Sequence, residues 1–193
     1  MKTINQCQSP WGAMKLEPSN STCCQIGCVT VGLCWLSDWY GRYVNPAKAI
    51  PKLSYTKEGY LFWNSADKVF PFKFVYRYYK RDDKKIQEIL NSKDGSCELQ
   101  VNNKKHWVVA LNYSKLKGYR VFDPLKGDTC WLTLRYGNGI QGFAEFTRDE
   151  TPSVCEVDEI EQELKDCKKK NLDLLEDNMH LEERLKEINK LSK

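Results

Sequence analysis

The sequence predicts an α+β domain in residues 1–150, in which a buried helix precedes an antiparallel sheet, followed by a coiled-coil helix in residues 151–193. Three observations lead to this prediction. Residues 28–40 form a nearly continuous apolar run, and several short strand-like segments follow residue 97. After Pro152 the composition changes to Glu, Lys, Asp, Asn and Leu, with no further Pro or Gly. A chain of 193 residues is long enough for one domain of ordinary size and a tail.

Two helices are expected in the first domain. The run at residues 28–40 reads CVTVGLCWLSDWY, and a helix with so few polar positions is buried on most sides. Gly32 within it allows another element to approach closely. A second, amphipathic helix fits residues 82–90, where Ile86, Ile89 and Leu90 lie on one face.

The sheet is predicted from five segments rich in β-branched and aromatic residues. Asn, Lys and Gly turns separate them, and no long helical pattern intervenes, so neighbouring strands are expected to be antiparallel. The segments are residues 97–101, 106–113, 118–123, 130–134 and 142–146.

The tail carries a heptad pattern, in which seam residues recur at alternating steps of three and four. Asn171 and Asn178 occupy a positions, where a buried amide is best satisfied by the same amide on a parallel, in-register partner. We therefore expect a homo-oligomer through residues 154–193; two strands are favoured and three remain open. The seam consists of Val157, Ile160, Leu164, Cys167, Asn171, Leu174, Asn178, Leu181, Leu185, Ile188 and Ser192.

The net charge of +4 is unevenly distributed. Residues 1–150 hold 22 Lys and Arg against 14 Asp and Glu, whereas residues 151–193 hold 8 against 12. A basic domain can favour polyanions such as an anionic cell wall, although the charge can also serve solubility alone. Nucleic acid is not the expected partner.

The first residues, MKTINQCQSPWG, lack the apolar core of a secretory signal or membrane anchor. We therefore expect a soluble protein made in a cytoplasm, with no membrane span. Without an export signal, an odd count of nine cysteines favours free thiols over disulfides. A structural zinc is disfavoured because the sequence has no C-x-x-C pair and only two histidines, and no other metal or cofactor is expected.

Cys28 is the candidate nucleophile among the cysteines around the apolar run. It follows Gly27 at the start of the predicted helix, where unpaired backbone N–H groups and the helix dipole favour a thiolate. Cys34 lies inside the helix and is expected to be a core residue, whereas Cys23 and Cys24 lie in the preceding loop.

A nucleophilic thiol also needs a base and a group that orients the base. His106 opens an apolar segment, and Asp123 ends the next one, 17 residues later, which suits two strands joined by a turn. The alternative is a surface histidine and an unrelated turn aspartate before a proline.

Several segments together resemble a known family. QSPWG, IGCVTVGL, VNPAKAIPKL, GYLFW, HWVVALNY and YRVFDP occur in this order within about residues 6–146. They resemble the papain-fold cysteine peptidases of the bacteriocin-leader-processing type, particularly soluble cell-wall and phage relatives. The resemblance implies a papain-like fold and hydrolysis of an amide bond.

The same resemblance implies a role for each matched residue. Cys28 would be the nucleophile, His106 the general base and acid, and Asp123 the group that orients the imidazole. Gln8, in QSPWG, matches the glutamine whose amide helps to bind the oxyanion, and Gln6 is the alternative. The sequence GCVTV departs from the usual continuation after the cysteine, so the oxyanion side of the pocket is expected to differ in shape.

Two classes of function follow. In the first, the protein is a cysteine peptidase or amidase (Cys-His-Asp) that acts on a protein or on bacterial peptidoglycan, as a phage or bacterial lytic enzyme with association to a virus particle. In the second, it is a catalytically silent papain-like interaction module or virion structural module. A leader peptidase fused to an exporter is disfavoured because the sequence has no transmembrane segment.

Overall fold

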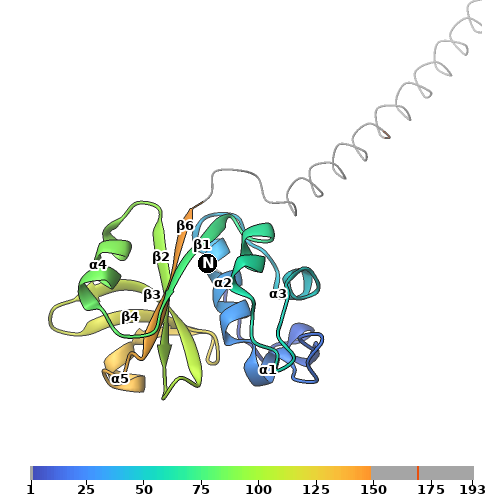
Figure 1. Ribbon diagram of the computed structural model, residues 1–193, viewed down its shortest axis with the longest axis horizontal. Helices are drawn as coiled ribbons and strands as arrows, with labels where there is room; N and C mark the ends of the chain where they lie inside the picture. Colours follow the sequence, from blue (N-terminus) through green and yellow to red (C-terminus); the bar gives the residue numbers. More distant parts are fainter. Residues whose placement is uncertain (1, 149–168, 170–193) are drawn as a thin grey trace, which may run out of the picture. The chain divides into compact units, whose positions relative to one another are not determined.

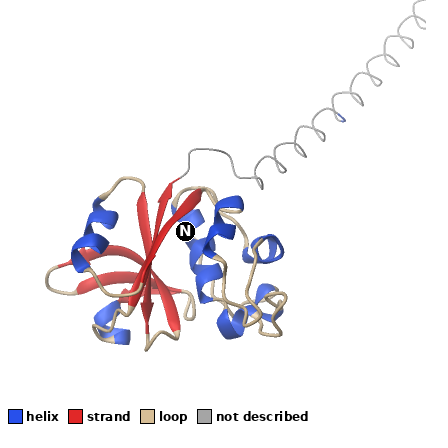
Figure 2. Ribbon diagram, in the orientation of Figure 1, coloured by secondary structure: helices blue, strands red, loops and turns tan. Residues whose placement is uncertain are grey.

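The computed structural model describes residues 2–148 and Lys169. The coiled coil predicted for residues 151–193 therefore lies, apart from that one lysine, outside the described residues. Figures 1 and 2 show a six-stranded antiparallel sheet with helices on both of its sides. The predicted α+β class with an antiparallel sheet is confirmed.

The strands follow the spatial order β1-β6-β2-β3-β4-β5. All neighbours pair antiparallel, with Phe74 opposite Phe146, Glu98 opposite Val109, and Val121 opposite Cys130. The strands are β1 (Phe72–Tyr78), β2 (Gly95–Val101), β3 (His106–Ser114), β4 (Gly118–Asp123), β5 (Asp128–Trp131) and β6 (Gly142–Arg148).

The helices begin at identifiable residues. The Asn45 side chain caps α3 by accepting a hydrogen bond from the Ala47 N–H, and Asp82 caps α4 in the same way through Lys85. Gly27 separates the short α1 from the long α2. The α-helices are α1 (Cys23–Ile26), α2 (Cys28–Trp39), α3 (Pro46–Ala49), α4 (Asp83–Asn91) and α5 (Leu132–Tyr136), and the 3₁₀ helices are Trp11–Ala13, Ile50–Lys52 and Trp63–Lys68.

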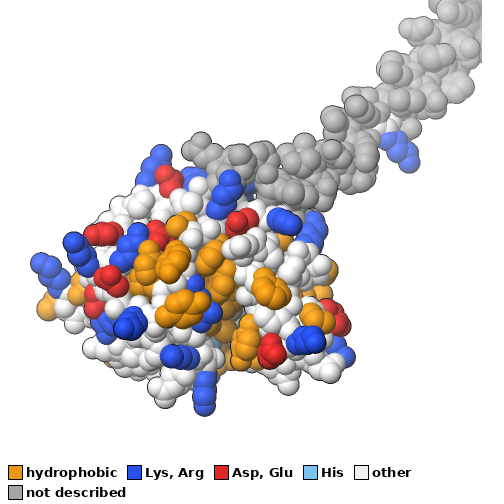
Figure 3. Space-filling model, viewed as in Figure 1, with side chains coloured by type: hydrophobic (Ala, Val, Ile, Leu, Met, Phe, Trp, Pro, Cys, Tyr) orange, Lys and Arg blue, Asp and Glu red, His pale blue; other side chains and the backbone are white. Residues whose placement is uncertain are grey.

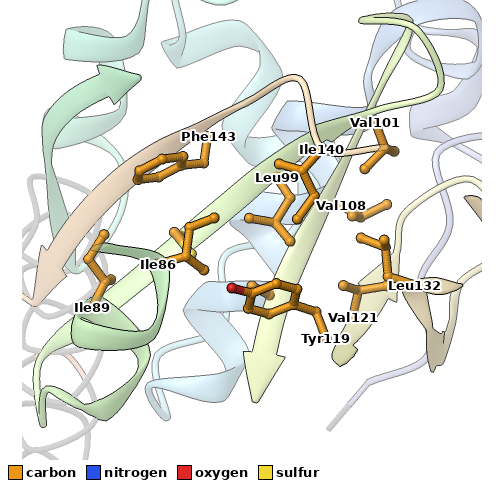
Figure 4. Close-up of a cluster of buried hydrophobic side chains, with 12 residues drawn as sticks. Ile86, Ile89, Leu99, Val101, Val108, Tyr119, Val121, Leu132, Ile140 and Phe143 are labelled. Carbon is orange, nitrogen blue, oxygen red and sulfur yellow. The ribbon is translucent and has the colours of Figure 1, made fainter. Parts of the chain in front are cut away.

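The two faces of the sheet pack against different helices, because successive side chains on a strand point to opposite faces. On one face, α4 buries Ile86 and Ile89 against alternate residues of β2, β3 and β4 (Figure 4). On the other face, the indole of Trp35 in α2 stacks on Phe122 of β4 at 4.4 Å between ring centroids. Gly32 in α2 faces Glu98 and Val109, and a Cβ at Gly32 would collide with the Glu98 carboxyl. This contact places the start of α2 beside the sheet.

One predicted strand is partly wrong. Residues 130–134 were expected to be extended, but β5 ends at Trp131, and Leu132 begins α5. Leu132 is buried in the core on the α4 side, whereas Leu134 is 83% exposed. The apolar run therefore has a helical rather than an alternating burial pattern. Gly137, with φ 62°, ends this helix in a backbone conformation that glycine adopts readily.

Strand β1 is not predicted by the sequence pattern. Its first residue, Phe72, is fully buried, but most of the strand is partly or fully exposed at the edge of the sheet. An edge strand of this kind lacks the alternation of buried and exposed positions on which the other predictions depend.

Candidate active site

Three elements bring the candidate site residues together. Cys28 is the first residue of α2, His106 is the first of β3, and Asp123 is the last of β4. Because β3 and β4 are antiparallel neighbours, the first residue of β3 and the last residue of β4 lie at the same end of this strand pair. Cys28 and His106 line one cleft of about 610 Å³, which we call the thiol cleft.

His106 and Asp123 form a buried pair. The Nε2 atom of the imidazole lies 2.8 Å from Oδ1 of Asp123, and the two residues are only 6% and 0% exposed. Since a carboxylate accepts hydrogen bonds, Nε2 carries the proton in the neutral ring. The remaining ring nitrogen, Nδ1, is then unprotonated and able to accept a proton.

Asp123 is held as an anion by groups that the sequence analysis did not identify. The Arg135 guanidinium donates to Oδ2 at 2.8 Å, the Tyr136 hydroxyl donates to Oδ2 at 2.7 Å, and the Leu125 N–H donates to Oδ1 at 3.0 Å. Burial alone would raise the pKa of Asp123, but the hydrogen bonds from His106, Tyr136 and Arg135 together hold it well below its ordinary value.

Arg135 and Tyr136 come from α5, the segment that was expected to be a strand. Arg135 is itself fixed by Asp128, whose carboxylate accepts two hydrogen bonds from it at 2.7 and 3.0 Å. The only local signal in the sequence is the Arg-Tyr-Gly ending of a short apolar segment, which is typical of a helix terminus. That signal gives the helix end but not the direction in which either side chain points.

Cys28 is 7% exposed and lines the thiol cleft. Burial, the largest cause, raises its pKa to about 12, against backbone N–H groups of Trp107, Val29 and Cys28 that favour the thiolate. The lowered pKa expected from the helix terminus is therefore wrong, because desolvation outweighs the dipole of the helix. At neutral pH Cys28 is a thiol, so its reaction as a nucleophile needs a base.

The two candidate glutamines lie in different surroundings. Gln8 is exposed and is not part of the thiol cleft, whereas Gln6 is 4% exposed and lines the cleft beside Cys28 and His106. The Gln6 N–H donates to the Pro124 carbonyl at 2.8 Å, and its Nε2 donates to the Cys24 carbonyl at 2.7 Å. The structure thus brings Gln6, and not Gln8, to the site.

Cys7 and Cys24 form a disulfide, which corrects the expectation of free thiols for this pair. The bond joins the segment that carries Gln6 to α1, four residues before Cys28. Neither the odd cysteine count nor the spacing reveals that the first residues fold back on α1. The described cysteines that remain free are Cys23, Cys28, Cys34, Cys97 and Cys130, and Cys34 is fully buried, as predicted for a core residue.

The walls of the thiol cleft are aromatic and basic. Tyr60, Phe62, Trp63 and Trp107 supply rings, while Arg77, Lys104 and Lys105 supply positive charge. Figure 3 shows hydrophobic side chains gathered in the hollowed middle of one face of the molecule, with Lys or Arg side chains among and around them.

Residues 2–148 contain neither a cluster of metal-binding side chains nor a helix that could span a membrane. No three His, Cys, Asp or Glu side chains of this part lie close enough together to hold a metal ion. Each of its helices is too short or too polar to cross a membrane.

The fold is similar to that of a solved structure, whereas searches by sequence give no match. No protein-family model matches the sequence, and no curated protein matches it. The crystal structure of a double glycine motif protease from an AMS/PCAT transporter, in complex with the leader peptide, is 18% identical in sequence. The match covers 63% of this chain and 84% of that chain, with a TM-score of 0.46. At this level of similarity, the activity and ligand of that protein are not carried over to this chain.

Proposed function

We propose that this protein is a thiol hydrolase that cleaves amide bonds, with Cys28 as nucleophile, His106 as general base and acid, and Asp123 as the group that orients the imidazole. The observation that carries the proposal is the buried His106–Asp123 pair, 2.8 Å apart, beside the cleft that also contains Cys28. A thiol, an imidazole and a carboxylate in this order are the parts that acyl transfer through a thioester requires.

The proposed reaction has two halves. The Cys28 sulfur attacks the carbonyl carbon of the scissile amide while Nδ1 of His106 takes the thiol proton. The C–N bond then breaks, the protonated imidazole gives its proton to the leaving amine, and a thioester remains on Cys28. In the second half, His106 takes a proton from water and the hydroxide attacks the carbonyl carbon of the thioester. The C–S bond then breaks, the acid product leaves, and the imidazolium returns its proton to the Cys28 sulfur. Asp123 stays ionised throughout.

Gln6 is proposed in place of Gln8 as the side chain that binds the oxyanion. One N–H of its amide is used by the Cys24 carbonyl, and the second can donate to the developing negative charge together with the Cys28 backbone N–H. Replacing Gln6 by Ala is expected to lower kcat by about 10². Gln8→Ala, at an exposed position two residues away, is the matched control and is expected to leave kcat unchanged.

The proposed substrate is a peptide, either in a protein or in bacterial peptidoglycan cleaved by a phage or bacterial lytic enzyme. The wall substrate is supported by the excess of 22 basic over 14 acidic residues in residues 1–150, since walls carry anionic polymers. Zymography on purified walls, beside digestion of casein, separates the two substrates.

Comparing Cys28→Ala with Cys34→Ala tests the hydrolase proposal. Both substitutions remove a buried thiol from α2, but only Cys28 lines the thiol cleft. We expect Cys28→Ala to abolish hydrolysis, whereas Cys34→Ala retains it. The raised pKa of Cys28 favours a second candidate, a non-catalytic binding module. That candidate is correct if Cys28→Ala keeps the biological effect of the protein and no substrate turns over.

Assembly through residues 154–193 is the remaining part of the proposal. The heptad seam described above needs partner helices to remove its leucines from water. Light scattering on the full chain and on residues 1–149 tests it: we expect a dimer or trimer for the first and a monomer for the second. A monomeric full chain would contradict the seam.

A further inference from the structure

A second cleft of about 560 Å³ adjoins the thiol cleft, and we call it the aromatic cleft. Phe62, Trp63 and Arg77 line both clefts, so the two spaces share a wall. The rest of the aromatic cleft comes from Asn64 and from residues of β1 and its end, namely Phe74, Tyr76 and Tyr79. A peptide that places its scissile bond at Cys28 can therefore extend along Arg77 into the aromatic cleft.

Arg77 is held among aromatic rings at the junction of the two clefts. Its Cζ atom lies 4.9 Å from the ring centroid of Tyr79, 5.2 Å from that of Trp107 and 5.9 Å from that of Trp63. Cation–π contacts of this kind attract a guanidinium to ring faces while its N–H groups can still donate hydrogen bonds. Its Nε atom is buried and has no hydrogen-bond partner within residues 2–148.

Arg77 lines the same cleft as Cys28, and Trp107 lies next to both residues. Its guanidinium contacts the ring of Trp107, and the backbone N–H of the same Trp107 favours the thiolate of Cys28. Lys104 and Lys105 line the thiol cleft as well, and neither cleft has an Asp or Glu among its described lining residues. The two clefts, which together we call the groove, therefore carry positive charge beside aromatic walls, and this charge attracts an anion.

We propose that Arg77 is a specificity residue that binds a carboxylate of the substrate next to the scissile bond. The occupant of the groove is an acidic peptide segment whose carboxylate pairs with the guanidinium edge, while neighbouring apolar side chains pack on the aromatic cleft. A planar guanidinium matches a carboxylate in a two-point geometry that a lysine cannot reproduce. The inference rests on the proposed function only in taking the ligand to be a peptide substrate.

Binding of synthetic peptides to the full chain carrying Cys28→Ala tests the subsite without turnover. The probes are fluorescent octapeptides that contain one Phe and place Glu, Gln or Lys at each position in turn, with a free or an amidated carboxyl terminus. Fluorescence polarisation measures Kd. We expect Glu to bind about tenfold more tightly than Gln at one or two adjacent positions, which corresponds to about 1.4 kcal/mol. A preference that follows only the free terminus assigns the carboxylate to the chain end.

Arg77→Gln in the Cys28→Ala background should remove the preference, so that Glu and Gln bind within about twofold of each other. Arg120→Gln removes the same charge from an exposed arginine on β4 outside both clefts, and should keep the tenfold preference. Arg77→Lys keeps the positive charge but loses the planar guanidinium. Its preference for Glu over Gln should be at least about threefold smaller than that of the protein with Arg77. Circular dichroism checks folding, and the lysine variant carries the test if Arg77→Gln is unfolded.

Two outcomes overturn the subsite: equal binding of Glu and Gln peptides at every position, including no binding at all, or equal loss of preference in Arg77→Gln and Arg120→Gln. Hydrolysis of the same peptides by the protein with Cys28 intact is measured in parallel. Selective, Arg77-dependent binding without hydrolysis would overturn the proposed function and leave the subsite standing. Hydrolysis without any preference for Glu would overturn the subsite and leave the proposed function standing.

Discussion

Asp123 and Glu98 are both fully buried carboxyl groups near the candidate site, and their surroundings are opposite. Asp123 accepts hydrogen bonds from His106, Arg135, Tyr136 and a backbone N–H, and its pKa is lowered. Neither oxygen of Glu98 has a hydrogen-bond partner within residues 2–148, and burial raises its pKa well above the ordinary value.

The difference shows where the protein stabilises negative charge. An ionised carboxylate contacts the imidazole of His106, where it would favour the imidazolium that the proposed reaction requires. On the other side, Glu98 packs against Gly32, one helical turn after Cys28, and a carboxylate there would oppose the thiolate. Because Glu98 favours its neutral form, the buried carboxyl beside His106 is charged and the one near Cys28 is not.

Asp123→Asn should cause the largest loss of kcat/KM among the variants considered below. Arg135 and Tyr136 would keep donating hydrogen bonds to the side-chain oxygen of the new Asn, so that its NH₂ group faces Nε2 of His106. Nε2 must then accept a hydrogen bond, and the ring proton moves to Nδ1. That tautomer cannot accept the thiol proton, so kcat/KM is expected to fall by about 10³ to 10⁴. Steady-state kinetics on any substrate found for the protein measures the change.

Asp128→Asn is the matched control for this prediction. Asp128 shares the Arg135 guanidinium with Asp123 but does not contact His106. It should change kcat/KM by less than about tenfold. An equal loss in both variants would mean that Arg135, and not the tautomer of His106, controls the activity.

The sequence predicted the elements with regular patterns. The apolar run that begins at Cys28 and the amphipathic pattern around Ile86 are both helices within a residue or two of the expected bounds. The hairpin that joins His106 to Asp123 followed from two apolar runs of strand length around a turn. In each case the local periodicity agrees with the tertiary packing, so the pattern of apolar residues was sufficient to predict the element.

The parts that escaped prediction depend on contacts between distant segments. Gln6 reaches the cleft because its backbone binds Pro124 and its segment is joined to α1 by the Cys7–Cys24 disulfide, and neither contact leaves a mark in the local sequence. The QSPWG motif favoured Gln8 for the same site, and the fold leaves that residue exposed. Similarly, Tyr136 reaches Asp123 only because α5 replaces the end of a predicted strand.

Glu98→Gln should change how the free energy of unfolding depends on pH. A carboxyl whose pKa is raised in the folded state stabilises the protein fully below its unfolded pKa of about 4.3, and the stabilisation is lost as pH rises toward the folded pKa. Relative to Glu98→Gln, the native protein should lose up to about 1.4 kcal/mol of unfolding free energy per pH unit in this window.

Urea unfolding of both proteins between pH 5 and 8 measures this difference. Asp123 does not contribute in this range, because its lowered pKa affects stability only as pH falls below its unfolded value of about 3.9. A constant difference between the two proteins across the range would show that Glu98 is ionised in the folded state.

Tyr136→Phe should change activity only slightly. It removes one of the hydrogen bonds to Asp123, which lowers the free energy of unfolding by about 1 to 2 kcal/mol and kcat/KM only a few-fold. Tyr119→Phe is the control, since the Tyr119 hydroxyl donates to Asp83 away from the site. It should cost similar stability without loss of activity, and a loss of activity in both variants would attribute the effect to general destabilisation.

The rate at which iodoacetamide alkylates Cys28 at pH 7 tests the pairing of Cys28 with His106 most directly. Mass spectrometry follows Cys28 and Cys130 in the same sample, and the partly exposed Cys130 serves as the internal reference. If His106 takes the proton of the buried thiol, His106→Ala should lower the Cys28 rate at least about tenfold and leave the Cys130 rate unchanged. Equal Cys28 rates in the two proteins would contradict the assignment of His106 as the base.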